Sequence, residues 1–91
     1  MMVARRWVLS GRVQGVGFRW FTMDRAAIEG IAGWVRNLPG GDVEVMAEGE
    51  FDAITRFERA IRQGPSRARV DDVATEILAP TGRFTGFSAR H

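Results

Sequence analysis

The sequence contains no cysteine and no lysine, and its only histidine is the final residue, His91. The absence of cysteine excludes disulfide bonds, thiolate metal sites and a cysteine nucleophile, and it fits a reducing compartment. No apolar run approaches the ~18 residues of a transmembrane helix. The apolar stretch at residues 7–9 is too short for the core of a signal peptide. We therefore expect a soluble cytoplasmic protein.

Few side chains are available for nucleophilic, acid–base or metal chemistry. Terminal His91 is a poor candidate for an embedded general base, so the sequence offers no evident histidine partner to activate Ser10, Ser66 or Ser88. Clustered metal ligands are missing, and the neighbouring acids Asp71 and Asp72 are more typical of a solvated strand edge. The sequence predicts no metal site and no cofactor.

All 13 basic residues are arginines, and the net charge is only +2 despite a pI of about 10.9. Arginine stays protonated near pH 10, which partly explains the high pI. Acidic and basic residues are interspersed, as in the segment from Glu50 to Arg62, so we expect a mixed solvated surface. We expect neither a nucleic-acid nor a membrane partner.

Hydrophobic patterning predicts a single domain over residues 1–91. The expected helices are residues 18–29 and 51–63. The expected strands are residues 3–10, 31–37, 42–48 and 70–78, with a short fifth strand at residues 84–89. The order is β-α-β-β-α-β. It predicts an α+β, ferredoxin-like sandwich, with an antiparallel sheet covered on one face by two helices.

Periodicity also predicts which faces are buried. The first helix is expected to bury Phe18, Phe21 and Ile28, while Arg25 and Glu29 pair at its rim. The second helix presents a stripe of Ile54, Phe57 and Ile61. The strand at 42–48 alternates, with its valines and Ala47 on the buried face and its acids in solvent. We expect all three tryptophans to pack rather than to contact substrate: Trp7, Trp20 and Trp34.

Residues 11–17 form a loop with three glycines between the first strand and the first helix. Glycines allow positive φ, and such a turn before a helix can present its N–H groups to an anion. No Ser, Thr, Asp or Asn is present to cap the helix. The Walker pattern fails for want of lysine, and Trp20 stands where a dinucleotide motif needs glycine. A plain turn and an anion-binding loop both remain open on composition alone. Arg19 in the first turn favours the second, because the helix dipole disfavours an uncompensated cation there.

Two segments resemble the acylphosphatase family. Residues 11–19 (GRVQGVGFR) match its first signature, Gly-x-Val-Gln-Gly-Val-x-Phe-Arg, at every fixed position. Residues 33–43 (GWVRNLPGGDV), closing with Gly49, are similar to its second signature, Gly-aromatic-Val-basic-Asn followed by Gly-x-Val and Gly. Residues 64–70 are similar to a weaker feature of the family. The resemblance covers nearly the whole chain.

This resemblance implies a ferredoxin-like fold and metal-independent hydrolysis of acyl phosphates to a carboxylate and orthophosphate. It implies that Arg19 binds phosphate and that Asn37 orients the attacking water. The phosphate-holding amides would come from the loop: Gln14, Gly15, Val16, Gly17 and Phe18. The partners would be a small acyl phosphate substrate and phosphate, as product and inhibitor, and we expect a monomer. From the residues alone, Asn37 is also typical of a turn.

Two departures from the family pattern and two alternatives accompany this interpretation. Leu38 follows Asn37 where many members carry threonine, and Glu29 occupies a position that is usually apolar. An RNA-binding module would use exposed aromatics on a similar sheet, but the strand at 42–48 has no aromatic residue and three acids. The other alternative is the acylphosphatase-like domain of a carbamoyl-transfer maturation protein, which is part of a far longer chain.

Overall fold

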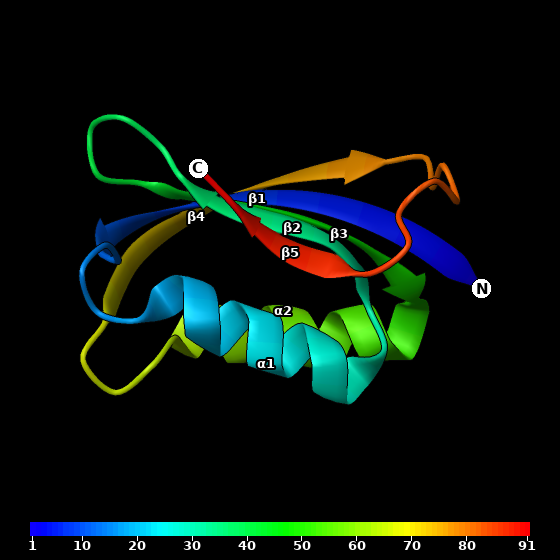
Figure 1. The fold of residues 1–91 in the computed structure, drawn as a ribbon, viewed down its shortest axis with the longest axis horizontal. Coiled ribbons are helices and arrows are strands. Elements are labelled where there is room, and N and C mark those ends of the chain that lie inside the picture. The colour runs from blue at the N-terminus through cyan, green and yellow to red at the C-terminus, as the bar shows by residue number, and fades with distance from the viewer.

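The computed structural model describes all residues, 1–91, and forms a sheet with two helices on one of its faces (Figure 1). The helices are α1 (Phe18–Glu29) and α2 (Phe51–Gln63). The strands are β1 (Met2–Arg12), β2 (Ala32–Asn37), β3 (Val43–Glu50), β4 (Arg69–Leu78) and β5 (Phe87–Arg90). The predicted element order is confirmed, and both helices have the predicted bounds. Neither helix is long and apolar enough to cross a membrane.

The sheet has the strand order β4-β1-β3-β2-β5. β1 pairs antiparallel with β3 and β4, and β2 pairs antiparallel with β3, as predicted. β5 pairs with β2 in parallel, so the prediction of a wholly antiparallel sheet is wrong for this strand. The connection from β4 crosses one end of the sheet to the opposite edge (Figure 1). β5 therefore returns antiparallel to β4, and this makes it parallel to β2.

The core lies between the sheet and the helices and consists of one cluster of 16 buried apolar residues. Its aromatic centre links three elements, because Phe57 of α2 lies 5.7 Å from Trp7 of β1 and 5.9 Å from Phe87 of β5, ring centre to ring centre. Trp7 is fully buried, as predicted, and so is the predicted α2 stripe of Ile54, Phe57 and Ile61. The core therefore fixes both helices and the last strand against the same central strands.

The buried face of α1 differs from the prediction. It consists of Phe18, Thr22 and Ala26, whereas Ile28 is 68% exposed. Thr22 is tolerated there because its hydroxyl donates to the Phe18 carbonyl oxygen at 2.8 Å. Ile28 follows Ala26 by two positions and is turned about 200° away from it around the helix, so it faces solvent.

Glu29 joins the two helices. Its Oε1 accepts a hydrogen bond from Nε of Arg56 in α2 at 2.8 Å, and only 9% of its side chain is exposed. The predicted pairing of Glu29 with Arg25 is therefore wrong. Arg56 neutralises the carboxylate, so the acid that departs from the expected pattern does not disrupt the helix pair.

Both faces of β3 are buried, although the alternating sequence predicts solvated acids on one of them. Val43, Val45 and Ala47 face the helices as predicted, but Glu44 and Glu48 are each only 3% exposed. Glu44 accepts hydrogen bonds at 2.5 Å from Nε of Arg6 in β1 and Nε of Arg36 in β2. Arginine side chains from the two neighbouring strands thus cover the central acid and pair with it.

Glu48 anchors the connection between β4 and β5. Its carboxylate accepts backbone N–H groups from Thr81 and from Gly82, the latter at 3.2 Å. These donors belong to the segment that crosses the end of the sheet. The crossing segment therefore covers Glu48, and the Glu48 carboxylate in turn holds this segment in place.

The ion pairs of Glu44 predict a pH-dependent contribution to stability. Burial by itself raises the pKa of Glu44, but hydrogen bonds and charges from Arg36 and Arg6 outweigh it, so the pKa lies below its ordinary value. Such a carboxyl stabilises the fold above its unfolded-state pKa of about 4.3, and this contribution disappears as the pH falls through the folded-state pKa. We expect Glu44→Gln to lower the free energy of unfolding by about 1–3 kcal/mol near pH ~7, and by less near pH ~3.

Urea unfolding of both proteins at the two pH values measures this difference. Glu58→Gln is the matched control, because Glu58 forms a surface pair with Arg62 one helical turn away. It should change stability by no more than about 0.5 kcal/mol. A Glu44 effect of equal size at both pH values would contradict the expected origin.

Candidate active site

The loop between β1 and α1 alternates buried valines with exposed glycines. Val13 and Val16 are 1% and 9% exposed and belong to the core cluster. Gly15 and Gly17 have φ angles of 74° and 79°, in the left-handed region that side chains disfavour. The space beside each of these glycines is open, so backbone conformation rather than crowding requires glycine. The valines anchor the loop, and the glycines leave its backbone uncovered.

The first turn of α1 has unsatisfied N–H groups. Gly17 is the N-cap, no side chain caps the helix, and no acid is present in its first turn. The absence of a side-chain cap is as predicted. The first N–H groups of a helix have no partner within it, and the helix dipole makes this end favourable for an anion.

A cavity of about 120 Å³ lies at this helix start. Its lining comes from the loop, the first turn of α1 and the end of β2: Val13, Gly15, Gly17, Phe18, Arg19, Trp20 and Asn37. The structure thus brings together Arg19, Asn37 and three of the five predicted loop residues. Gln14 and Val16 do not line the cavity.

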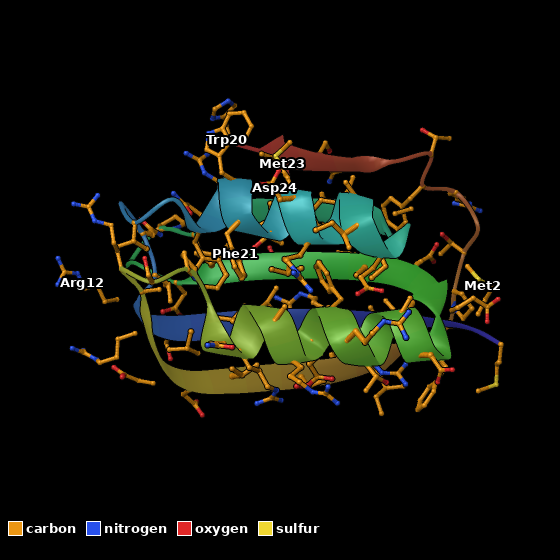
Figure 2. All side chains as sticks on the ribbon, turned by 90° about the horizontal axis from the view of Figure 1, so that it is seen from below. Met2, Arg12, Trp20, Phe21, Met23 and Asp24 are labelled. Atoms are coloured by element: carbon orange, nitrogen blue, oxygen red, sulfur yellow. The ribbon has the colours of Figure 1, made fainter.

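Arg19 lies beside this cavity without a protein partner. Its guanidinium takes part in none of the ion pairs or side-chain hydrogen bonds of the structure, and the side chain is partly buried. Arg12, at the end of β1, is exposed and points away from α1 (Figure 2). Of the two arginines in residues 11–19, only Arg19 lines the cavity.

Asn37 is the last residue of β2 and pairs with Val43 of β3. The hairpin closes through backbone groups, because the N–H of Leu38 donates to the Asp42 carbonyl at 2.8 Å and that of Gly41 to the Leu38 carbonyl at 3.3 Å. The Asn37 side chain makes no hydrogen bond to either, so the structure gives no support to a side-chain role in the turn. Its amide carbonyl can accept a hydrogen bond from water.

Gln14 connects the loop to this hairpin. Its Nε2 donates to the carbonyl oxygens of Leu38 and Asp42, both at 2.8 Å. These two carbonyls flank the turn that follows Asn37, so the Gln14 side chain fixes the position of the loop relative to Asn37. The sequence predicts only a backbone contribution from Gln14, because the hairpin is more than twenty positions away in the chain.

Two tryptophans differ from the packing prediction. Trp20 is 71% exposed and lines the cavity, because it follows Phe18 by two positions and so leaves the buried face of α1. Trp34 is half-buried on the face of the sheet that the helices do not cover. The guanidinium carbons of Arg36 and Arg90 lie 5.3 and 4.8 Å from its ring centre. No motif in the sequence singles out Trp20 as a site residue beyond its place next to Arg19.

The Gln14 contacts predict a positioning effect. We expect Gln14→Leu to lower the free energy of unfolding by about 1–3 kcal/mol, because it removes two hydrogen bonds to backbone carbonyls. Hydrolysis of an acyl phosphate, the activity that the resemblance implies, should fall about tenfold as the loop and Asn37 lose their fixed separation. Urea unfolding and initial rates measure the two effects. Gln63→Leu, at the exposed end of α2, is the matched control and should alter neither appreciably; equal effects from both variants would contradict this role.

Comparison with known proteins agrees with the fold and identifies the family. The acylphosphatase family model matches residues 5–89. The chain is 45% identical over 92 residues to an acylphosphatase of Marinobacter nauticus, covering 99% of this chain and 100% of that protein. The crystal structure of an acylphosphatase from Bacillus subtilis matches at a TM-score of 0.94 and 35% identity over 100% of both chains, which confirms the fold prediction.

A part of full-length HypF also matches. It amounts to 12% of that longer chain, covers 100% of this one, and has a TM-score of 0.87 at 26% identity. Both values are lower than those for the Bacillus subtilis acylphosphatase. Sequence, fold and site geometry lead to one conclusion: the chain belongs to the acylphosphatase family.

Proposed function

We propose that this protein hydrolyses the carboxyl–phosphate bond of acyl phosphates at the cavity between the β1–α1 loop and the end of β2. One observation carries the proposal: the unpaired Arg19 and the unbonded amide of Asn37 line the same small cavity at an uncapped helix start. Arg19 is proposed to bind the phosphoryl group and Asn37 to orient the attacking water. The backbone N–H groups of the loop would complete the phosphate site: Gln14, Gly15, Val16, Gly17 and Phe18.

The proposed binding step is electrostatic. The planar guanidinium of Arg19 can donate two parallel hydrogen bonds to phosphoryl oxygens, and backbone N–H groups and the α1 dipole add further positive potential. Phosphoryl transfer depends mainly on positioning and on stabilising charge on the equatorial oxygens. A cationic side chain and fixed amides, which need no rearrangement during the reaction, suit this requirement.

The chemical step is a single displacement at phosphorus. The oxygen of a water held by the Asn37 side-chain carbonyl attacks the phosphorus atom. The bond from phosphorus to the bridging oxygen breaks, and its electron pair leaves with the carboxylate. A proton from the water passes to a phosphate oxygen of the substrate, since no acidic or histidine side chain lines the cavity to act as a base. The carboxylate leaves as a stable anion and needs no general acid. The products are a carboxylate and orthophosphate.

The proposed site has consequences for inhibition by phosphate and for the need of a metal ion. Orthophosphate should occupy the same site as the substrate phosphoryl group and inhibit competitively. Because Arg19 and the backbone supply the positive charge, the reaction should proceed without a metal ion. A cytoplasmic location, a monomeric state and a single domain over residues 1–91 stay predictions.

Hydrolysis of a synthetic aryl acyl phosphate, such as benzoyl phosphate, with and without a chelator tests the proposal. We expect equal rates in both conditions and competitive inhibition by phosphate. Arg19→Ala should lower turnover by about 10³-fold and remove most of the phosphate affinity, because it removes the charged donor. Arg12→Ala is the control and should have a far smaller effect, since that side chain points away from the cavity. Equal losses at both positions, or activity abolished by chelator and restored by a divalent ion, would overturn the proposed site.

Asn37→Ala should separate binding from chemistry. If Asn37 only orients water, phosphate affinity stays near that of the native protein while turnover falls by about 10²-fold, the scale of lost positioning. Stability should change little, because the backbone hydrogen bonds of the hairpin do not involve the Asn37 side chain. Phosphate inhibition, turnover and the thermal midpoint are measured on the same variant. A destabilised but fully active protein would instead make Asn37 a turn residue.

A further inference from the structure

A second cavity adjoins the one proposed to hold phosphate. Its volume is about 400 Å³, and it shares Arg19 and Trp20 with the smaller cavity. The rest of its lining comes from α1 and from the end of the chain: Met23, Phe87, Ser88, Ala89 and His91. The two cavities are therefore neighbours that share a boundary formed by Arg19 and Trp20.

The wall of the larger cavity is mainly apolar and well supported. Trp20 and Met23 are three residues apart on α1, so they share one side of the helix. Figure 2 shows both on the side of α1 toward β5, whereas Phe21 lies toward α2. Phe87 packs on the ring of Phe57 in the core, which fixes the β5 side of the wall.

The chemistry of an acyl phosphate relates the two cavities. Only one bridging oxygen separates the phosphorus atom from the carbonyl carbon, so the acyl group must lie directly beside the bound phosphoryl group. The smaller cavity, at about 120 Å³, falls well below the roughly 300–1,000 Å³ of ordinary ligand pockets. The larger one, at about 400 Å³, lies within that range and begins at the residue proposed to bind the phosphoryl group.

Exposure alone does not single out Trp20. Ile28, on the same helix, is 68% exposed compared with 71% for Trp20. Ile28 lines none of the cavities in the structure, whereas Trp20 lines two neighbouring ones. The Trp20 ring thus offers an uncovered apolar surface where a substrate can reach it, and covering such a surface with an aromatic group is favourable.

We propose that the larger cavity holds the acyl group of the substrate and that Trp20 determines specificity. The protein then prefers acyl phosphates with an aromatic or bulky apolar acyl group over acetyl phosphate. This inference rests on the proposed function of the same site. Ala89, whose small side chain leaves room on the β5 side, is a second residue on which the preference depends.

The test compares kcat/KM for benzoyl phosphate and acetyl phosphate in the native protein and in three variants. The change in the benzoyl-to-acetyl ratio between proteins cancels the different intrinsic reactivities of the two substrates. Trp20→Ala should lower this ratio about tenfold, mainly through the KM for benzoyl phosphate, the scale of lost apolar contacts in a pocket. Ala89→Phe should lower it as well, because the added ring occupies the space for the acyl group. Ile28→Ala is the matched control and should leave the ratio within about twofold of the native value.

The outcomes separate the two proposals. A ratio that neither Trp20→Ala nor Ala89→Phe changes, in a protein that hydrolyses both substrates, overturns the acyl-group inference and leaves the proposed function intact. Equal losses on both substrates in Trp20→Ala also overturn it, because they place Trp20 at the phosphate end alone. Failure of the native protein to hydrolyse either substrate overturns the proposed function, and the inference with it.

Discussion

The burial of Val13 and Val16 holds the β1–α1 loop against the core, and the geometry of the site depends on it. Each buried valine stabilises the fold by about 1.5–3 kcal/mol. Glycine loses more conformational freedom on folding than any other residue, a cost of roughly 0.5–1 kcal/mol relative to alanine within regular structure. The free energy gained by burying the two valines therefore outweighs the conformational cost of ordering Gly15 and Gly17. An otherwise flexible segment becomes a fixed backbone surface, and α1 starts from it without a side-chain cap.

Arg19, which lines the small cavity, has no carboxylate partner. Away from the site, carboxylates pair with many of the arginines, as Glu44 does with Arg6 and Arg36 and Glu29 with Arg56. Other arginines lack a carboxylate as well, but among them only Arg19 lines the small cavity. Its positive potential is thus directed at a place where an anion can meet backbone N–H groups at the same time. This coincidence, rather than the net charge of the chain, distinguishes the site.

Local patterns in the sequence predict the elements well and their long-range partners poorly. Both helices can be predicted because residue preferences and hydrophobic periodicity act within a few residues. The ion-pair partner of Glu29 could not be predicted from local patterns, because Arg56 is 27 positions away and on the other helix. The burial of Glu44 and Glu48 could not be predicted either. Their alternating positions in the strand indicate solvent exposure, but side chains of the neighbouring strands cover Glu44 and the crossing segment covers Glu48. In the candidate site, the motifs single out Arg19 and Asn37, and both line the cavity. The Gln14 side-chain contacts and the exposure of Trp20 depend on tertiary structure.

The position of the short last strand, β5, in the proposed substrate site depends on contacts on both faces of the sheet. β5 has only four residues, and its pairing begins where the N–H of Gly33 donates to the Gly86 carbonyl at 2.9 Å. Glu48 fixes the preceding segment by accepting N–H groups from Thr81 and Gly82 on the face opposite the helices. Because Phe87 and Ala89 follow this segment, the wall of the larger cavity depends on a buried carboxylate across the sheet. The proposed phosphate end lies at the β1–α1 loop and the first turn of α1, and the proposed acyl end lies between α1 and the last strand, β5. A substrate that occupies both the phosphate end and the acyl end would therefore depend on the pairing of β5 with β2 at the edge of the sheet.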